Sequence, residues 1–346
     1  MFPETFVYRH LVWSDLGEHV FDPFSGRGTT VFESLLRGRR AAGCDTNPVA
    51  VCVSNAKANP PSRSEAQARL KEIAAAHATT ESPLFDDPFF SLCFHRETLE
   101  QILHLQAALA WRDRSSDCFL AALALGSLHG ESHRSQRYFS NRMPRTISTK
   151  PDYSIRWWTA RGSAPPRRDV YRILREMIDY RFASEPAKLT GRVVEGDARR
   201  AGRLFPHLRK KISLVVTSPP YLDTTNFEED QWLRIWFLGG PPRPRRSGRG
   251  DDRHRSDRKY WAFLEAAWAG VSPLLADGAH LIIRIGGKKL DPATIRHDLH
   301  RGLENGLGRA VRVLEERATE IAGSQLRAFR PGAAGTKEEL DFHFAV

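Results

Sequence analysis

The sequence predicts an α/β fold built around a doubly wound, mostly parallel sheet. Short apolar runs rich in β-branched residues alternate with helical stretches, which is the pattern of a sheet covered on both faces. One such run, residues 211–217, ends at Pro219 and Pro220, and neither proline can donate to a β-ladder. A strand must therefore stop there, at the edge where open α/β sheets bind their ligands. Hydrophobic residues make up 41% of the 346, which is enough for a sizeable core.

The expected elements follow in order along the chain. Residues 2–16 are expected to form a short helix with Phe2, Phe6, Leu11 and Val12 on one face. Strands are expected at 19–22, 39–45, 192–197, 211–217, 280–285, 311–316 and 340–346, and helices at 29–37, from Pro48, 64–77, 95–111, 115–129, 167–182 and 261–269. The last two strands alternate with period 2, so we expect an antiparallel pair that places a reversed seventh strand at the edge of the sheet.

A glycine-rich loop follows the first strand, in the stretch Phe21-Asp-Pro-Phe-Ser-Gly-Arg-Gly-Thr-Thr30. Gly26 and Gly28 permit positive φ and a close approach of the backbone to a ligand. The helix that begins at Thr29 then offers unpaired N–H groups and the positive end of its dipole. A dinucleotide-binding loop would need a third glycine, and a Walker A loop would need Gly-Lys-Ser/Thr, which this stretch lacks.

Two further strands also end in an acid. Asp45 lies 23 residues after Asp22, where an acid of a doubly wound sheet commonly takes ribose hydroxyls. Asp197 ends the strand at 192–197. The alternative role of either carboxylate is to cap the helix that follows it. For Asp45 the ribose role is the favoured interpretation.

Ser218-Pro219-Pro220-Tyr221 is expected to form a rigid turn that holds a flat, weakly nucleophilic amino group. The Ser218 hydroxyl and the Pro219 carbonyl can accept hydrogen bonds from an exocyclic NH2, which leaves the nitrogen lone pair free to meet an electrophile. Tyr221 can stack on the ring that carries the amine. The alternative is a strand-ending turn without chemistry, and the second motif at residues 21–30 weighs against it.

Together, the two motifs resemble those of the DNA amino-methyltransferases, which transfer a methyl group from S-adenosylmethionine to N4 of cytosine or N6 of adenine. The resemblance covers residues 1–58 and about 186–346. It implies a class I methyltransferase-like sheet, S-adenosylmethionine as the cofactor, double-stranded DNA as the substrate and no metal. The residues that it implies for the cofactor are Asp22, Pro23, Phe24, Gly26, Gly28, Thr29, Thr30, Asp45 and Asp197, and those for catalysis are Ser218, Pro219, Pro220 and Tyr221.

The resemblance also suggests a role for individual residues and a target base. It implies that Asp22 holds the methionine end of the cofactor, that Phe24 packs near the cofactor, and that Asp197 meets the adenine. Family members with Ser before Pro-Pro-Tyr mostly methylate cytosine N4, so N4 of cytosine is favoured over N6 of adenine. Methylation of RNA or of a protein amide, and a DNA-binding module without activity, remain as alternatives. The resemblance leaves open whether a cognate restriction endonuclease accompanies the chain in a restriction-modification system.

The expected organisation is a cofactor half at 1–58, a helical and basic insertion at 59–185, and a catalytic half at 186–346. The net charge of +11 suits a polyanionic partner. Residues 133–169 hold nine Lys and Arg against two Asp, with aromatic side chains interleaved, which is typical of a nucleic-acid surface. We expect DNA contacts there from Arg137, Tyr138, Arg142 and Arg145. The alternative is a solvated loop whose aromatic residues pack back on the helices.

A second basic stretch, residues 239–259, holds seven Arg and one Lys against three Asp and has no apolar periodicity. We expect a loop near the mouth of the active site, with Arg245 and Arg246 on phosphates, and plain disorder is the alternative.

The remaining features bound the protein class. No apolar run approaches the ~20 residues that span a membrane, and the N-terminus lacks the apolar core of a signal peptide, so a cytoplasmic protein is expected. The four cysteines have no CxxC spacing, so no zinc site is expected; they are Cys44, Cys52, Cys93 and Cys118. None of them lies near the Pro-Pro turn, which argues against a C5-cytosine mechanism.

Overall fold

The structure is a computed structural model that describes residues 4–77, 87–130, 132–143, 150–222, 227–244, 256–286, 291–320 and 338–346. The chain divides into two compact units. The sheet unit consists of Met1–Ser54, Ala187–Thr225 and Ser247–Val346, and the helical unit consists of Asn55–Pro186 and Asn226–Arg246. Residues 226–246, which the sequence analysis counts with the catalytic half, therefore belong to the helical unit.

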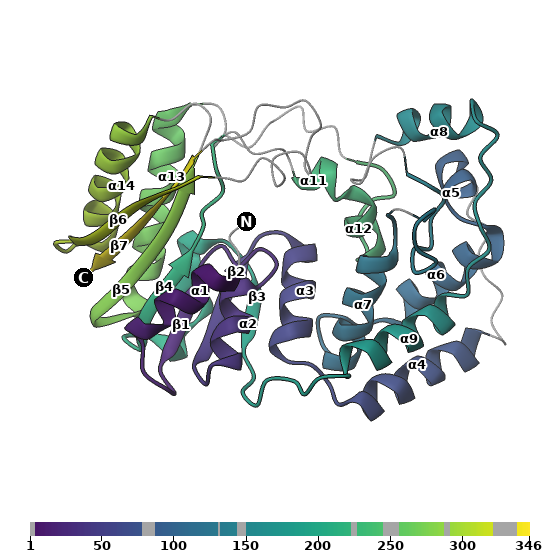
Figure 1. Cartoon of the computed structure of the whole chain (residues 1–346), viewed down its shortest axis with the longest axis horizontal. Helices are drawn as coiled ribbons and strands as arrows, with labels where there is room; N and C mark the ends of the chain where they lie inside the picture. The colour runs from purple at the N-terminus through teal and green to yellow at the C-terminus, as the bar shows by residue number, and fades with distance from the viewer. Residues whose placement is uncertain are drawn as a thin grey trace. The chain divides into compact units, whose positions relative to one another are not determined.

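The sheet unit contains a seven-stranded sheet in the described residues, with the order β3-β2-β1-β4-β5-β7-β6 (Figure 1). The strands are β1 (His19–Asp22), β2 (Arg40–Asp45), β3 (Arg192–Glu195), β4 (Ile212–Thr217), β5 (Leu275–Gly286), β6 (Arg312–Glu320) and β7 (Glu338–Ala345). The first five strands in this order pair in parallel, whereas β7 is antiparallel to both β5 and β6. The predicted doubly wound, class I methyltransferase-like sheet with a reversed last strand is confirmed.

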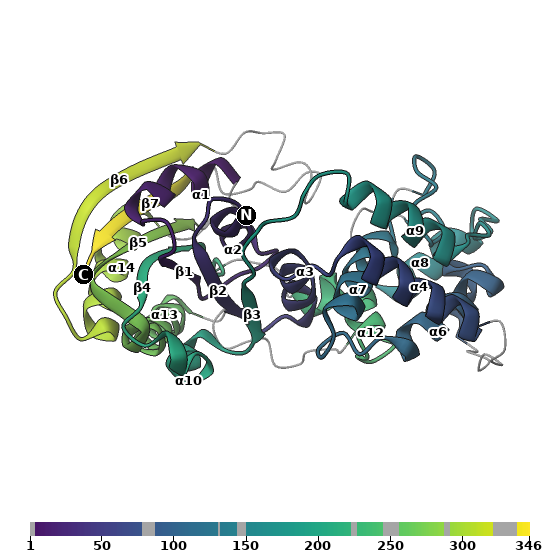
Figure 2. The same ribbon diagram turned by 90° about the horizontal axis from the view of Figure 1, so that it is seen from below.

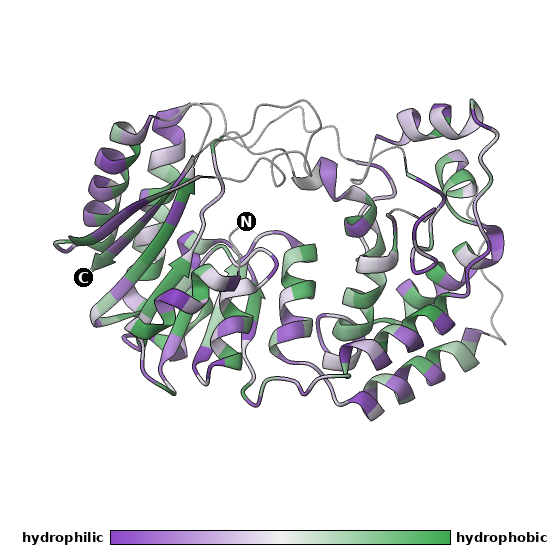
Figure 3. Cartoon of the chain, viewed as in Figure 1, coloured by the Kyte–Doolittle hydropathy of each residue, from purple (hydrophilic) through white to green (hydrophobic). Residues whose placement is uncertain are grey.

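The predicted position of the reversed strand is wrong, because β7 lies between β5 and β6 and β6 forms the edge. The side chains explain this order. Leu340, Phe342 and Phe344 of β7 are buried in the core, so β7 is better placed with a neighbour on each side. In contrast, β6 carries mostly charged and exposed residues (Figure 3), which suit an edge strand that must not pair further.

Helices cover both faces of the sheet. On one face lie α1 (Glu4–His10), the 3-10 helix η1 (Leu11–Trp13) and α2 (Thr29–Leu36). On the other face lie η2 (Ala198–Arg200), α10 (Ala201–Leu204), α13 (Asp257–Val271) and α14 (Pro292–Leu307), with η3 (Pro206–Leu208) and η5 (Ser272–Leu274) at their ends (Figure 2). Phe6, Val7 and Leu11 pack on β1, β4 and β5, whereas Val12 is 73% exposed, which corrects its predicted place on the same face as Phe6 and Leu11.

The helical unit contains α4 (Arg63–His77), α5 (Pro88–Cys93), α6 (Arg96–Ala108), α7 (Ser115–Ser127), α8 (Pro151–Thr159), α9 (Val170–Arg181), α11 (Phe227–Asp230) and α12 (Trp232–Phe237), and α3 (Pro48–Ala58) spans the division between the units. Trp232 and Trp236 of α12 pack against Phe89 and Phe90 of α5, which explains why residues 226–246 belong here. In the part of the chain that the structure describes, no helix has the length and apolar character that crossing a membrane requires.

Candidate active site

The two sequence motifs meet at the carboxyl edge of the sheet. The strand order reverses between β1 and β4, and open α/β sheets bind ligands at such a switch point. Asp22 ends β1 and Thr217 ends β4, just before the Pro-Pro turn. The Thr217 hydroxyl donates to the Asp22 carboxylate at 2.6 Å, so one hydrogen bond joins the glycine-loop motif to the Ser-Pro-Pro-Tyr motif.

The Asp22 carboxylate is almost fully buried, with 1% of the residue exposed. It accepts from Thr217 and from the Phe24 backbone N–H at 3.0 Å. Burial raises its pKa to about 6, and hydrogen bonding with Thr217, the Phe24 N–H and Thr30 only partly opposes this rise. Because these donors are neutral, a positively charged ligand group beside Asp22 would relieve the cost of its burial. This site therefore fits the cationic methionine end of the expected cofactor.

The glycine loop has the backbone that its sequence predicts. Gly26 has φ +50° and Gly28 has φ +77°, and Gly28 is the N-cap of α2. A side chain at Gly28 would put a Cβ 2.7 Å from Ser54 Oγ, so the loop packs directly on α3. The Ser54 hydroxyl in turn donates to the Gly26 carbonyl at 2.9 Å. Bare backbone is thus held at the ligand edge of the sheet.

The two other predicted acids have local partners. Asp45 accepts from the Gly26 N–H and from the Asn47 N–H, both at 2.8 Å, so it orders the glycine loop. Asp197 caps η2 through the Arg199 N–H at 2.9 Å and also pairs with the Arg199 guanidinium. The capping alternative therefore applies to Asp197.

The remaining predicted cofactor residues divide between lining and support. The Phe24 ring is half-buried and lies 6.0 Å from the Phe263 ring, centroid to centroid. The Thr30 hydroxyl is buried and donates to the Val216 carbonyl at 2.9 Å, which fastens α2 to β4. Pro23 is buried and Thr29 is half-buried. Thr30 thus supports the loop from behind.

The Ser-Pro-Pro-Tyr turn has a feature that the sequence analysis missed. The Tyr221 hydroxyl donates to Glu339 Oε1 at 2.7 Å, and Ser218 Oγ donates to the Tyr221 hydroxyl at 3.5 Å. Glu339 belongs to β7 and shares Arg284 of β5 with Asp341, two residues further along β7. A signal was available, because an Arg within the apolar β5 run and acids alternating with Leu340 and Phe342 are unusual in buried strands.

The predicted DNA-contact residues of the helical unit are partly exposed. Arg137 is exposed and its guanidinium lies 5.1 Å from the Tyr180 ring centroid, and Tyr138 is half-buried. Exposed Arg142 and Arg161 both face the Trp157 ring, at 6.0 and 4.4 Å. Arg145, Arg245 and Arg246 lie outside the described residues.

Two of the interleaved aromatic residues pack inward. Phe139 and Trp158 are fully buried, and the Trp158 indole donates to the Arg142 carbonyl at 2.7 Å. The alternative interpretation, in which the aromatic residues pack back on the helices, therefore holds for these two. The basic stretch at 239–259 is also divided, because Ser256 caps α13 and residues 257–259 begin that helix.

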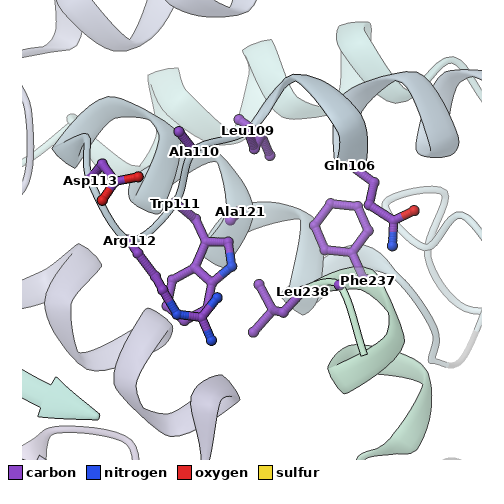
Figure 4. Close-up of a pocket in the computed structure, with 10 residues that line it drawn as sticks. Gln106, Leu109, Ala110, Trp111, Arg112, Asp113, Ala121, Phe237 and Leu238 are labelled. Atoms are coloured by element: carbon purple, nitrogen blue, oxygen red, sulfur yellow. The ribbon is translucent and has the colours of Figure 1, made fainter. Parts of the chain in front are cut away.

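The helical unit also contains a pocket of about 260 Å³ (Figure 4). Trp111 and Arg112, from the connection after α6, lie opposite Phe237 and Leu238 at the end of α12. The Gln106 amide donates to the Trp236 carbonyl at 2.6 Å and helps to hold these two segments together. None of the residues that line this pocket belongs to either sequence motif, and we assign the pocket no ligand.

Comparison with known proteins found no matching protein-family profile and no matching curated protein. Among solved structures, the chain is similar to TrmN from Thermus thermophilus, with 12% identity and a TM-score of 0.34 over 99% of this chain and 47% of that one. It is also similar to the rRNA methyltransferase aviRa from Streptomyces viridochromogenes, with 12% identity and a TM-score of 0.34 over 99% and 85% of the two chains.

A third similar structure is a mutant of the 16S rRNA (adenine(1408)-N(1))-methyltransferase from Catenulisporales acidiphilia, with cosubstrate SAM. It shares 11% identity at a TM-score of 0.36, over 100% of this chain and 92% of that one. These TM-scores lie below 0.5, so the fold of the present chain rests on its own strand order.

Proposed function

We propose that the chain is a DNA amino-methyltransferase that uses S-adenosylmethionine and methylates an exocyclic amine, with N4 of cytosine favoured. The observation that carries the proposal is the Thr217–Asp22 hydrogen bond of 2.6 Å at the switch point of the sheet. It joins the edge that suits a cationic cofactor to the turn that suits an amine.

Each residue has a role in this proposal. Asp22, the loop from Pro23 to Gly28, Thr29, Asp45 and Asp197 would hold the cofactor, which supplies a methyl group on a positive sulfur. Ser218 Oγ and the Pro219 carbonyl would accept hydrogen bonds from the two N–H groups of the amine and so direct the nitrogen lone pair at the methyl group. Pro220 keeps the turn rigid, and the Tyr221 ring lies beside the target base. Catalysis is then mostly a matter of positioning.

In a duplex the target amine belongs to a paired and stacked base that cannot enter the site, so the base would have to leave the stack. The exposed Arg142 and Arg161 and the half-buried Trp157 support a polyanionic partner for the helical unit, because guanidinium and indole groups together suit phosphates and unstacked bases. We expect the substrate to be double-stranded DNA. N6 of adenine is the alternative target, since a Ser hydroxyl serves either amine.

A methyl-transfer assay tests the proposal. Purified chain is incubated with tritiated S-adenosylmethionine and with unmethylated DNA, RNA or total protein as three separate acceptors, and Asp22→Ala serves as the cofactor-site control. We expect label in DNA only. Label only in RNA or only in protein would show that DNA is not the substrate. No label in any acceptor would contradict methyl transfer.

Nucleoside mass spectrometry of the labelled DNA then identifies the base. We expect N4-methylcytosine. If N6-methyladenine is the only new nucleoside, the interpretation of Ser218 is wrong and the remaining roles stand. Methylation-aware sequencing of DNA from an expressing host identifies the recognition sequence.

A further inference from the structure

The Ser218 hydroxyl is chemically ambiguous, because a hydroxyl can donate a hydrogen bond as well as accept one. A donating Ser218 would suit a base carbonyl, whereas an accepting Ser218 would suit an amine. The direction of the hydrogen bonds behind Ser218 decides between the two. Those bonds run from Ser218 through Tyr221 to Glu339.

The direction is set at Glu339. Its Oε1 accepts from Tyr221 at 2.7 Å, and its Oε2 lies 3.4 Å from the Arg284 guanidinium. Arg284 is always charged and is 5% exposed, and its guanidinium directs a donor at the carboxylate of Glu339. A carboxylate oxygen accepts hydrogen bonds, and the single Tyr221 proton is therefore committed to Glu339.

The consequence passes along the chain to Ser218. Because the Tyr221 proton points at Glu339, the Tyr221 oxygen can only accept from Ser218, whose Oγ lies 3.5 Å away. Catalytic hydrogen bonds are often this long before a substrate is bound. With its proton so directed, Ser218 Oγ presents only lone pairs to the target, which match an N–H and repel a carbonyl oxygen.

Further contacts hold Arg284 in position. Arg284 makes a two-pronged pair with Asp341, with Nε–Oδ1 at 2.6 Å and Nη2–Oδ2 at 2.7 Å. Asp341 also accepts from the Thr319 hydroxyl at 3.0 Å. Glu339 and Asp341 are each 8% exposed and face the same side of β7. Arg284 is thus fixed by Asp341 and remains available to Glu339.

We propose that Glu339 is a positioning and specificity-determining residue: through Tyr221 it makes Ser218 a hydrogen-bond acceptor, and so selects a base amine over a base carbonyl. This inference rests on the proposed function. It adds a residue outside both motifs and a physical reason for the substrate class.

The test uses Glu339→Gln, with Asp341→Asn as the matched control. Both variants remove one carboxylate charge beside Arg284, but only Glu339 contacts Tyr221. The Gln amide can donate to the Tyr221 oxygen, which frees the Tyr221 proton to turn towards Ser218. Tyr221→Phe removes the connecting hydroxyl while keeping the ring, and so gives a second route if Glu339→Gln folds poorly.

The first measurement needs no activity. The hydroxyl proton of Tyr221, identified in the NMR spectrum by its loss in Tyr221→Phe, is expected far downfield, to move in Glu339→Gln, and to stay in place in Asp341→Asn. A resonance unaffected by Glu339→Gln would overturn the proposal, whether or not the protein methylates DNA.

The second measurement is discrimination. Once the recognition sequence is known, duplexes carry at the target position either the natural base or its carbonyl analogue, uracil for cytosine or hypoxanthine for adenine. The preference is the ratio of the affinities for the amine duplex and the carbonyl duplex. We expect this ratio to fall about 10-fold in Glu339→Gln and Tyr221→Phe, equivalent to about 1.4 kcal/mol of binding free energy, and to persist in Asp341→Asn. Equal preference in all four proteins would overturn the inference. Wild-type protein that methylates nothing would instead contradict the proposed function.

Discussion

Asp22 gives the candidate site its dependence on pH. Its pKa is raised from 3.8 to about 6 by burial, so below pH 3.8 the carboxyl is protonated in both the folded and the unfolded chain. Between these values the folded chain holds more protons than the unfolded chain. The folded state therefore loses stability as the pH rises from 3.8 to about 6, and the loss is complete above that range.

The first prediction follows from that sign. Asp22→Asn should remove a destabilisation that reaches about 3 kcal/mol at neutral pH. Urea unfolding of both proteins at several pH values between 4 and 7.5 gives the difference in unfolding free energy. The variant should gain on the wild type as the pH rises to about 6 and keep a constant advantage above it. Parallel pH profiles would mean that Asp22 is not desolvated.

The second prediction separates binding from turnover. Ser218→Ala should lower kcat about 10- to 100-fold, because an acceptor of the amine is lost, and should leave the calorimetric affinity for S-adenosylmethionine unchanged. In contrast, Asp22→Ala should strongly weaken the affinity for S-adenosylmethionine. If Ser218→Ala weakens cofactor binding as much as Asp22→Ala, the two motifs do not have separate roles.

At the residue scale, the sequence could identify what lies within a motif. Asp22, Gly26, Gly28 and Ser218 were found because strand ends, glycines and prolines have local physical signatures. Glu339 was not found, because it reaches Tyr221 only through the pairing of β5 with β7, 118 residues away along the chain. The hydrogen-bond partners of Asp45 and Asp197 could not be predicted either, because they depend on how the loops fold.

At the element scale, the glycine loop and α2 depend on one close contact. Gly28 has φ +77° and its missing Cβ would lie 2.7 Å from Ser54 Oγ. Gly17 has a similar φ of +84°, and a Cβ there would meet nothing within 4 Å. A substitution at Gly17 therefore causes backbone strain alone, whereas one at Gly28 adds a steric overlap with Ser54.

The third prediction uses this pair. Gly17→Ala should cost about 1–2 kcal/mol of unfolding free energy from the left-handed backbone alone. Gly28→Ala should cost more than Gly17→Ala and should also weaken binding of S-adenosylmethionine. Adding Ser54→Ala should recover part of the Gly28→Ala loss in a double-mutant cycle measured by urea unfolding. Equal costs at the two glycines would show that the loop does not press on α3.

The order of strands was only partly readable from the sequence. Period-2 alternation indicated β6 and β7 as an antiparallel pair, and that pairing is confirmed. It could not say which of the two joins β5, because both choices satisfy a hairpin-like pair. The buried face of β7 decides it. Among the helices that were missed, α5, α8 and α12 are short and depend on packing partners. In contrast, α14 had a signal in the sequence, because Ile295, Leu299, Leu303 and Leu307 recur every four residues.

At the scale of the whole molecule, charge is the dominant property. The net charge is +11, and residues 133–169 alone hold nine Lys and Arg against two Asp. Such a balance supports association with a polyanion that weakens as salt is added, because bound counterions are released. The described part of the helical unit offers two exposed guanidinium groups, Arg142 and Arg161, at one indole ring.

The last prediction tests that surface. DNA affinity of the wild type should fall linearly on a log–log plot against salt, with a slope near about −0.9 for each phosphate neutralised. If Arg142 and Arg161 each contact one phosphate, the Arg142→Gln and Arg161→Gln double variant should flatten the slope by about 1.8. Arg172→Gln is the matched control, because the Arg172 guanidinium already pairs with Glu176 at 2.7 Å. An equal slope in all three proteins would remove the Trp157 cluster from the interface, since a phosphate contact cannot be lost without a change in counterion release.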